Sequence, residues 1–334
     1  IIGVQCAYSA YESDSFHVIN LIREIPKEIF KQPLIVVGGA HTSANPEYVL
    51  RNKDIDLAVI GEGEETILEI ATKFKENKKL NNLKGTALVI NDKIRVNPKR
   101  EFIKNIDSLF PAYHLIDINL YFKHPDNSKA TMRERAVDII TSRGCPANCV
   151  FCSINTVWGR KWRGRSVESI IKEVELLTKK YGVRQLRIQD DNLTLDKKRI
   201  IKLCNSIIKR KINIKWDTPN GIAIWALDKE VISKMKKAGC YRITFGIESG
   251  CPKSQAYIRK ILDHGKIVKF IKICHKNHIW VCGTFIIGFP YETRENILET
   301  KDFIFNSGIN FPFVYVAQPY LGTDMYNDFK KEGL

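Results

Sequence analysis

The chain has 334 residues, of which 44% are hydrophobic, with a mean hydropathy of −0.21 and a formal net charge of +16 at pH 7. This composition excludes a mainly disordered polypeptide and leaves room for two domains. No apolar run reaches the roughly 18 to 20 residues of a membrane span, and the first residues lack the basic flank of a signal peptide, so we expect a cytoplasmic protein. Because the chain opens without Met and within a strand-like run, we also expect residues upstream of it.

The first part of the chain alternates strand-like and helical patterns, which is typical of an α/β fold. GVQCAYSA, PLIVVGG and DLAVIGEGEE predict strands, and a helical pattern follows each of them, the first over about residues 15–30 and the second from about Asn45. The second and third strands end in glycine loops that hold Gly38, Gly39, Gly61 and Glu62. Backbone can approach a ligand closely at such loops, at the carboxyl edge of a parallel sheet. Tight turns are the alternative interpretation of these loops.

Residues 81–134 change character. TALVIN and KIRVNP predict two short strands, and the mixed stretch HPDNSKATMRER follows later. We interpret this region as a small extension of the first domain followed by a linker. The predicted organisation is a first domain over residues 1–100, a linker over 101–134 and a second domain over 135–334.

The rest of the chain predicts a second series, in which six strands alternate with helices. The expected strands are VDIIT, VRQLRIQ, INIKWDT, YRITFGI, WVCGTFIIG and PFVYVAQ. The expected helices run from about Ser166 to Lys180, from about Asp196, up to Gly239, through Asn277 and after Thr293. Six units favour an open (β/α)6 partial barrel over a closed eight-stranded barrel, with the functional edge at the carboxyl ends of the strands.

Three of the nine cysteines lie within eight residues, in CPANCVFC, after the first strand of the second series. An odd number of cysteines without a secretory signal argues against a disulfide framework and favours metal binding or catalysis. Cys145, Cys149 and Cys152 are therefore candidate ligands of a soft metal centre. Zinc is the alternative, but the fourth Cys or His of a structural zinc site does not follow at zinc-finger spacing. We expect the other six cysteines to be buried hydrophobic side chains.

The C-x-x-x-C-x-x-C spacing, with Phe151 before the last cysteine, resembles the signature of the radical S-adenosylmethionine enzymes. The resemblance covers about residues 135–325 and implies the partial TIM-like barrel that these enzymes share. It implies a 4Fe-4S cluster on the three cysteines, whose unique iron binds the amino and carboxylate groups of S-adenosylmethionine, with Phe151 among the cofactor-binding residues. Reductive cleavage of the sulfonium then yields a 5′-deoxyadenosyl radical, with electrons from an external donor such as flavodoxin or ferredoxin.

A segment after the second strand of this series, RIQDDNLT, resembles the family's segment that faces the methionine amino group. The resemblance makes Asp190 and Asp191 the candidates for that contact. Capping of the following helix by Asn192 or Asp196 is the alternative interpretation of the same stretch.

Two later strand ends resemble the parts of the family's site that hold the adenosyl group. FGIESG, after the fourth strand, resembles the ribose-binding segment, so that Glu248 and Ser249 would bond hydroxyls. FIIGFPYET, after the fifth strand, resembles the backbone segment beside adenine, with Ile286, Gly288 and Pro290 as the candidates. A Gly-Pro turn that ends a buried strand is compatible with the same residues.

The N-terminal part resembles the Rossmann-like cobalamin-binding domain that precedes the barrel in one group of these enzymes, notably in VVGGAHTSANPEYVL and DLAVIGEGEETILEI. Gly38, Gly39, Gly61 and Glu62 would then line the corrinoid and its nucleotide tail, and a side chain in place of Gly39 is expected to block binding. His41 lies in the GGAH loop and not in the D-x-H-x-x-G pattern of His-ligated cobalamin proteins, which leaves the lower ligand of cobalt open.

The two resemblances together imply a cobalamin-dependent methyltransferase that acts on an unactivated carbon or phosphorus of a small molecule, lipid or natural product. A cobalamin-dependent cyclase or rearrangement enzyme is an alternative from the same group. The basic stretch WGRKWRGRS keeps an RNA-modifying, methylthiotransferase-like enzyme as a further alternative, but the N-terminal part lacks a second cysteine cluster. Otherwise this stretch shapes the loop beside the cysteines and anchors the next helix. A non-enzymatic metal-binding protein is the remaining alternative. We expect a small-molecule substrate and no nucleic-acid partner.

Overall fold

The computed structural model describes residues 1–7, 9–29, 31–123 and 131–334. The chain forms two compact units. The first unit comprises Ile1–Lys104, Val150–Lys161 and Gln318–Leu334, and the second comprises Asn105–Cys149 and Trp162–Ala317. The predicted linker over 101–134 includes residues 124–130, which lie outside the described residues. The domain boundaries expected from the sequence stay predictions.

The sheet of the first unit has five strands in the order β1-β2-β3-β4-β5. The first three strands pair in parallel, and β4 and β5 add an antiparallel hairpin to one edge. Asn91 and Asp92 both have positive φ, 49° and 59°, which suits the two-residue turn of a hairpin. The strands are β1 (Ile2–Gln5), β2 (Ile35–Gly38), β3 (Leu57–Val59), β4 (Thr86–Ile90) and β5 (Lys93–Val96).

The helices of the first unit are shorter than the sequence patterns suggest. The helix expected over about residues 15–30 ends at Glu24, because Ile25 precedes a proline and is extended. The helix expected from about Asn45 is two short helices separated at that residue, whose φ is −144°. The helical segments are η1 (Ser9–Tyr11), α1 (Glu12–Glu24), α2 (Ala40–Ala44), α3 (Pro46–Val49), α4 (Glu64–Lys75), η4 (Ile154–Thr156) and α13 (Asp324–Lys331).

Both faces of this sheet carry a hydrophobic core. Ile35 and Val37 of β2 pack in one cluster and Val36 in another, because successive side chains of a strand point to opposite faces. A strand buried on both faces reads as a continuous apolar run, as in PLIVV. The continuous apolar run therefore identifies β2 as a buried strand. It does not indicate that β4 and β5 pair antiparallel beside β3.

The second unit contains a six-stranded parallel sheet in the order β13-β12-β11-β10-β9-β6. This confirms the predicted α/β fold with its six-stranded partial barrel. A small antiparallel pair, β7 with β8, stands apart from the main sheet. The strands are β6 (Ala136–Ile139), β7 (Ser142–Arg143), β8 (Arg163–Gly164), β9 (Gln185–Ile188), β10 (Lys215–Ile222), β11 (Cys240–Glu248), β12 (Trp280–Ile287) and β13 (Phe311–Val316).

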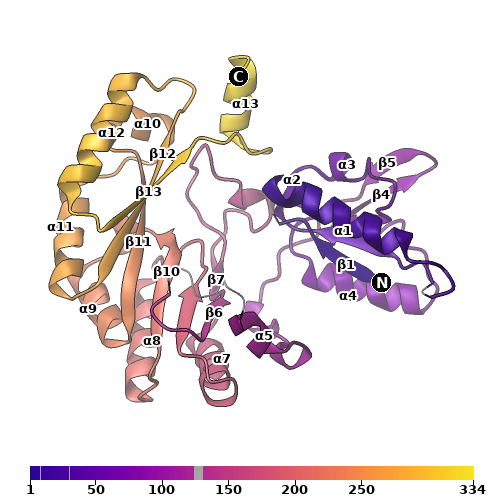
Figure 1. Cartoon of the computed structure of the whole chain (residues 1–334), viewed down its shortest axis with the longest axis horizontal. Coiled ribbons are helices and arrows are strands. Elements are labelled where there is room, and N and C mark those ends of the chain that lie inside the picture. The colour runs from indigo at the N-terminus through magenta and orange to yellow at the C-terminus, as the bar shows by residue number, and fades with distance from the viewer. Residues whose placement is uncertain (8, 30, 124–130) are drawn as a thin grey trace. The chain divides into compact units, whose positions relative to one another are not determined.

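The helices α7, α8, α9, α11 and α12 line the outer side of the six strands (Figure 1). Each begins after a Ser, Asp or Thr whose side chain accepts a hydrogen bond from the first turn, namely Ser166, Asp196, Asp228, Asp263 and Thr293. The helical segments of this unit are η2 (Ile106–Ser108), η3 (Tyr113–Leu115), α5 (Ile118–Lys123), α7 (Val167–Lys180), α8 (Lys197–Lys209), η5 (Ile224–Ala226), α9 (Lys229–Lys237), α10 (Pro252–Tyr257), α11 (His264–Lys276) and α12 (Arg294–Ser307).

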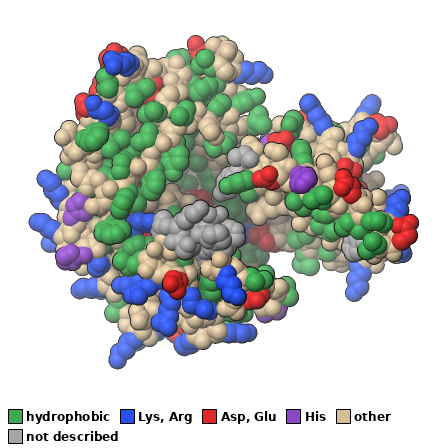
Figure 2. Space-filling view, in the orientation of Figure 1, with side chains coloured by type: hydrophobic (Ala, Val, Ile, Leu, Met, Phe, Trp, Pro, Cys, Tyr) green, Lys and Arg blue, Asp and Glu red, His purple; other side chains and the backbone are tan. Residues whose placement is uncertain are grey.

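The surface shows both charged and apolar regions. Lys and Arg side chains are spread over the face seen in Figure 2, among large areas of hydrophobic side chains. All six residues of the edge strand β13 are exposed. Among the described residues, no helix has the length and apolar character needed to cross a bilayer.

Candidate functional site

The three clustered cysteines lie on an irregular loop that follows β7 and runs into η4. Cys145, Cys149 and Cys152 are half-buried, whereas the other six cysteines are buried as predicted. No group of three His, Cys, Asp or Glu side chains within the described ranges converges on a single ion position. The thiolates of a four-iron cluster bind different irons and need not converge on one point. Three accessible thiols on one loop therefore fit a cluster.

Asp190 and Asp191, which follow β9, hold the stem of the cysteine loop. One oxygen of Asp190 accepts from the Thr141 backbone N–H at 2.5 Å, and the other accepts from the hydroxyls of Thr141 and Ser142 at 2.6 Å each. Asp191 accepts from the Gly144 backbone N–H at 2.9 Å. Burial raises the pKa of Asp190 and raises the pKa of Asp191 to about 6. The two carboxylates thus fix the residues that lead into Cys145.

Helix capping, the alternative interpretation of this stretch, is carried out by Asp196 and not by Asp190 or Asp191. The side chain of Asp196 accepts from the backbone N–H of Arg199 and caps α8. The described hydrogen bonds of Asp190 and Asp191 run instead to residues 141–144. The sequence indicates that these carboxylates are near the site, but it does not show that Asp190 acts through the loop.

A buried network of charged side chains supports the same stem from behind. Arg199 donates to the carbonyl oxygen and the hydroxyl of Thr141 at 2.5 and 2.8 Å. Arg199 also donates to the carbonyl oxygen of Arg165, which forms a buried ion pair with Glu173. The Tyr113 hydroxyl donates to the other oxygen of Glu173 at 2.5 Å. Because buried charges are stable only when paired, this network fixes the backbone ahead of the cysteines.

The basic stretch WGRKWRGRS contributes to this support. Arg165 is part of the buried network, and Ser166 caps α7. The indole N–H of Trp162 donates to the carbonyl oxygen of Asn192 at 3.0 Å, and the Arg199 guanidinium lies 5.4 Å from the Trp162 ring centre. These contacts match the interpretation in which the stretch shapes the cysteine loop and anchors the next helix.

Glu248 ends β11 in an unusual backbone conformation. Its φ is +67°, and the register between β11 and β12 shifts between Gly246 and Glu248. A non-glycine residue in the left-handed region is strained and points to a local function. Its side chain pairs with the Lys260 ammonium at 2.9 Å and accepts from the Thr284 hydroxyl at 3.2 Å. A Cβ added to Gly246 would lie 2.8 Å from both charged groups, so a side chain there would displace the ends of Glu248 and Lys260.

Lys260 and Glu248 lie within electrostatic reach of Cys149. Burial raises the pKa of the Cys149 thiol, the positive charge of Lys260 opposes that rise, and the negative charge of Glu248 adds to it. Lys260 was not among the residues that the sequence indicated. It lies twelve residues after Glu248 in a segment without a motif, and only the chain reversal through α10 brings the two together.

Ser249 is fully buried, and its hydroxyl already has partners. It lies 2.9 Å from the Thr300 hydroxyl of α12 and accepts from the Cys251 backbone N–H at 3.0 Å. Ser249 therefore anchors the turn from β11 into α10. Of the two candidates in FGIESG, Glu248 has the side chain placed beside other charged and polar groups of the site.

The end of β12 is held by a second carboxylate. Gly288 has a φ of +85°, and its N–H donates to Glu292 at 2.6 Å. The other oxygen of Glu292 accepts from Ser254 of α10 at 2.8 Å. Ile286 lies two residues earlier and pairs with Tyr315 of β13. The backbone around Ile286 and Gly288 is thereby fixed at the carboxyl edge of the sheet, next to the end of β11.

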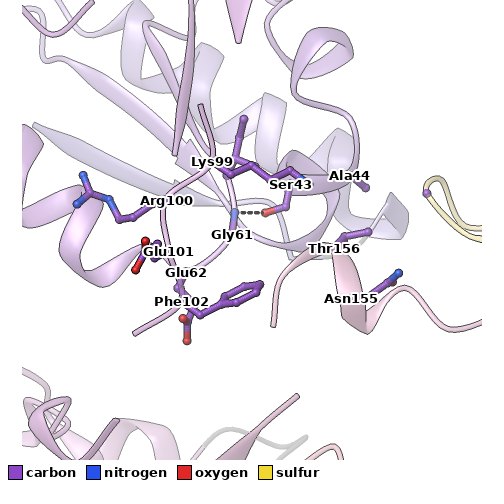
Figure 3. A pocket seen from close by; sticks show the side chains of 12 residues that line it. Ser43, Ala44, Gly61, Glu62, Lys99, Arg100, Glu101, Phe102, Asn155 and Thr156 are labelled. Atoms are coloured by element: carbon purple, nitrogen blue, oxygen red, sulfur yellow. Dashed lines mark hydrogen bonds between the residues drawn. The ribbon is translucent and has the colours of Figure 1, made fainter. Parts of the chain in front are cut away.

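The first unit contains a cavity of about 330 Å³ (Figure 3). It opens where β2 and β3 end, at the edge on which the sequence placed a ligand. Residues from five separate stretches of the chain line it: Ser43, Ala44, Ile60, Gly61, Glu62, Lys99, Arg100, Glu101, Phe102, Asn155, Thr156 and Gly322. Of the glycine-loop candidates, Gly61 and Glu62 line the cavity, and Gly38 and Gly39 are not among its lining residues.

A hydroxyl joins the two glycine loops of this unit. Ser43 donates to the carbonyl oxygen of Gly39 at 2.8 Å and accepts from the N–H of Gly61 at 2.9 Å, as Figure 3 shows for the second bond. Gly61 has a φ of +79°, and only Val157 O would lie within 4 Å of an added Cβ, at 3.9 Å. Glu62 is buried and accepts from the Ile103 backbone N–H at 2.8 Å. Gly61 thus leaves open space beside the cavity wall.

Gly39 is required for a different reason from the one expected. Its φ is +115°, and a Cβ at this position would lie 2.4 Å from the carbonyl oxygen of Cys6. A side chain here would meet the chain itself before any ligand, and the expectation that it blocks cobalamin binding stays a prediction. Gly38 closes β2, and an added Cβ would make ordinary contact with Val59 at 3.7 Å.

His41 is packed inside the first unit. Its Nδ1 lies 2.8 Å from the Ser9 hydroxyl and its Nε2 lies 3.0 Å from a carboxylate oxygen of Glu12. The ring also makes an edge contact with Tyr48. Nδ1 thus has a polar partner within the unit, whereas Nε2 lies close to a carboxylate but has no hydrogen-bond partner among the described residues, and His41 is 5% exposed. The arrangement gives His41 a structural role that ties α1 and η1 to the loop after β2.

Known proteins share both halves of this arrangement. Residues 139–304 match the Radical SAM superfamily, and residues 1–71 match the B12 binding domain. An uncharacterized methyltransferase of Pyrococcus horikoshii is 34% identical over 328 residues, covering 98% of this chain and 68% of that protein. The cytidylyl-2-hydroxyethylphosphonate methyltransferase of Streptomyces wedmorensis is 28% identical, covering 100% of this chain and 67% of that protein.

The fold also matches that of a solved enzyme. The radical S-adenosylmethionine methyltransferase TsrM of Kitasatospora setae, with cobalamin and a [4Fe-4S] cluster bound, superposes with a TM-score of 0.80 at 17% identity, covering 99% of this chain and 63% of that one. This chain therefore spans about two thirds of the length of these relatives. Its glycine-lined cavity and its loop of three accessible thiols fit the cofactors that the matches imply. The chain belongs to the cobalamin-dependent radical S-adenosylmethionine enzymes, which use a 4Fe-4S cluster, S-adenosylmethionine and cobalamin.

Proposed function

We propose that this enzyme is a methyltransferase that acts on an unactivated carbon or phosphorus of a small molecule. The observation that carries the proposal is the presence in one chain of a loop with three accessible thiols and a glycine-lined cavity at the carboxyl ends of parallel strands. The names of the two relatives reported above, both methyltransferases, support it. An external electron donor such as flavodoxin or ferredoxin supplies the reducing electrons in this proposal.

Cys145, Cys149 and Cys152 would hold the cluster, with Phe151 beside it. A bound cluster supplies electrons for the reductive cleavage of S-adenosylmethionine. Asp190 and Asp191 are positioning residues in this proposal, because their hydrogen bonds run to the backbone and hydroxyls of residues 141–144. They fix the backbone that leads into Cys145.

The ends of β11 and β12 would hold the adenosyl part of S-adenosylmethionine. Glu248 can accept hydrogen bonds from ribose hydroxyls, with Ser249 fixing the turn that carries it. Lys260 offers an ammonium group beside Cys149, where a negatively charged group of the substrate would be favoured. The backbone of Ile286 and Gly288 would flank the adenine, with Pro290 in the same loop.

In the first unit, the cavity lined by Gly61 and Glu62 would accept part of the corrinoid, including its nucleotide tail. Bound cobalamin supplies a methyl carrier. Gly38 and Gly39 shape the loop that brings Ser43 to the cavity, so their contribution is to its wall. His41 is not proposed as a cobalt ligand, because it is buried and its ring packs against Ser9, Glu12 and Tyr48 within the unit.

A cyclase activity is the second candidate, because an anaerobic magnesium-protoporphyrin IX monomethyl ester cyclase of Cereibacter sphaeroides is 27% identical over 294 residues. The products of S-adenosylmethionine separate the two activities. Methyl donation leaves S-adenosylhomocysteine, whereas reductive cleavage leaves methionine and 5′-deoxyadenosine. A methyltransferase therefore forms S-adenosylhomocysteine with substrate, and a cyclase forms only the cleavage products.

The experiment uses protein purified without oxygen, with cobalamin, S-adenosylmethionine and a strong reductant. We expect both product classes, and we expect Cys145→Ala, Cys149→Ala and Cys152→Ala each to lose the cluster and the cleavage activity, because two thiolates are too few ligands. Cys274→Ala and Cys282→Ala are the controls and should keep the iron content. Wild-type iron content in all three variants of the cysteine loop would contradict the assignment of the ligands.

A further inference from the structure

The segment that carries the last cysteine of the motif forms part of the cavity wall in the first unit. Residues Val150–Lys161 belong to that unit, and Asn155 and Thr156 line its cavity. These two residues follow Cys152 by three and four positions. The Val150 carbonyl oxygen accepts from the Met325 N–H at 3.0 Å, and η4 contacts α2. One segment therefore carries Cys152 and contributes to the wall of the cavity.

Close packing joins this segment to the opposite side of the cavity. A Cβ on Gly159 would lie 2.6 Å from the ring of Phe102, which itself lines the cavity. Val157 is buried, and its carbonyl oxygen faces the open side of Gly61. Figure 3 shows Phe102 and Thr156 approaching the cavity from different segments. Movement of residues 150–161 would thus change the shape of the cavity, and filling the cavity would restrain them.

One buried polar atom on this segment has no partner. The side-chain oxygen of Asn155 is buried and accepts no hydrogen bond from the described residues. An unsatisfied buried acceptor is unfavourable, and native proteins rarely leave one without a reason. Corrinoids carry many side-chain amides and a ribose hydroxyl, all of which can donate. A ligand donor in the cavity would satisfy Asn155.

We propose that cobalamin in this cavity and the iron–sulfur cluster stabilise each other through residues 150–161. The inference rests on the proposed assignment of the cavity to the corrinoid. A corrinoid that bonds Asn155 holds the segment in place, and the Cys152 thiolate then dissociates from iron less often. Because such coupling is reciprocal, the cluster should raise the affinity for cobalamin by the same factor.

The first test measures cluster loss from the reconstituted full chain on exposure to an iron chelator, by absorbance and iron content. Three samples are compared: no corrinoid, hydroxocobalamin, and cobinamide, which lacks the nucleotide tail. A coupling of typical size predicts loss about tenfold slower with cobalamin. Cobinamide should protect less, because it leaves the tail's part of the cavity empty. Equal loss with and without bound cobalamin would overturn the coupling, and equal protection by cobinamide would overturn the role of the tail.

The second test uses Asn155→Ala, with Asn306→Ala in α12 of the other unit as the matched control. Because the Asn155 oxygen accepts no hydrogen bond from the described residues, the variant should keep the thermal stability of the unliganded protein. It should bind cobalamin about tenfold more weakly and lose the protection of the cluster, whereas the control behaves as wild type. Unchanged affinity and protection in Asn155→Ala would overturn the role of this residue.

The outcomes separate this inference from the proposed function. If the wild-type protein does not bind cobalamin at all, both proposals fail. If it binds cobalamin saturably and the rate of cluster loss does not change, the coupling fails and the proposed function stands. The reciprocal effect is tested by measuring the cobalamin affinity of protein with and without the cluster. Equal affinities would also refute the coupling.

Discussion

The two units use the carboxyl ends of their parallel strands in different ways. In the second unit, the acidic residues that follow the strands are engaged by neighbours: Asp190 and Asp191 hold the cysteine loop, and Glu248 pairs with Lys260. In the first unit, the glycine loops leave a cavity whose walls come partly from segments outside the sheet. An acidic strand end can therefore support a site without touching its ligand, and a glycine strand end can serve the chain as well as a cofactor.

The largest effect should come from Asp190→Ala. The change leaves the Thr141 N–H and two hydroxyls without their acceptor. It also removes a carboxylate that interacts electrostatically with the buried Arg199. Breaking a buried charged contact of this kind costs about 3–5 kcal/mol. We expect a lower urea midpoint together with reduced iron retention. Wild-type cluster retention in a folded Asp190→Ala protein would show that the stem of the loop does not need this carboxylate.

A somewhat smaller effect is expected from Gly39→Val, which tests whether glycine serves the chain or the cofactor. The added side chain would overlap the Cys6 carbonyl oxygen, so the first unit should lose about 3 kcal/mol of stability even without cobalamin. Gly61→Ala is the comparison, since it meets open space and carries mainly the strain of a positive φ, about 1 kcal/mol. Limited proteolysis of the unliganded variants measures both. Equal protease resistance of the two variants would contradict this distinction.

Glu248→Gln and Lys260→Met test whether the charged pair at the end of β11 binds S-adenosylmethionine. Loss of one charged hydrogen bond should weaken binding by roughly 1.5–3 kcal/mol, about ten- to a hundredfold, while the cluster remains. Equilibrium dialysis gives the affinity, and the exposed Glu230→Gln in α9 is the control. If neither variant changes the affinity, the pair serves only to end the strand.

The smallest expected effect is the pH dependence of Asp191. Burial raises its pKa to about 6 from 3.8, so folding disfavours the charged form relative to the unfolded chain. The stability that this group contributes is complete below the unfolded pKa and is lost as the pH rises through the folded pKa. Asp191→Asn should therefore be more stable than wild type above pH 6, by about 1–2 kcal/mol after solvent screening, with little difference near pH 4. Thermal unfolding of cluster-free protein across this range provides the measurement, and a pH-independent difference would contradict the pKa shift.

Local sequence patterns were sufficient to predict the α/β class of both units and the three cysteines as metal ligands. Apolar runs, glycine stops and capping residues such as Ser166, Asp196 and Thr293 act over a few residues, so the six strands and their helices could be read directly. The three cysteines lie within eight residues, so their spacing can be recognised without knowledge of the fold.

Which strand-end residues line a cavity and which support the chain depends on tertiary contacts. The pairing of Glu248 with Lys260, the overlap at Gly39 and the cavity shared by Gly61, Phe102 and Asn155 depend on segments that are distant in sequence. Local patterns carry no information about such contacts, because the backbone path between the partners sets their distance. The hairpin of β4 and β5 shows the same limit, since its strands were readable but their place in the first sheet followed from packing.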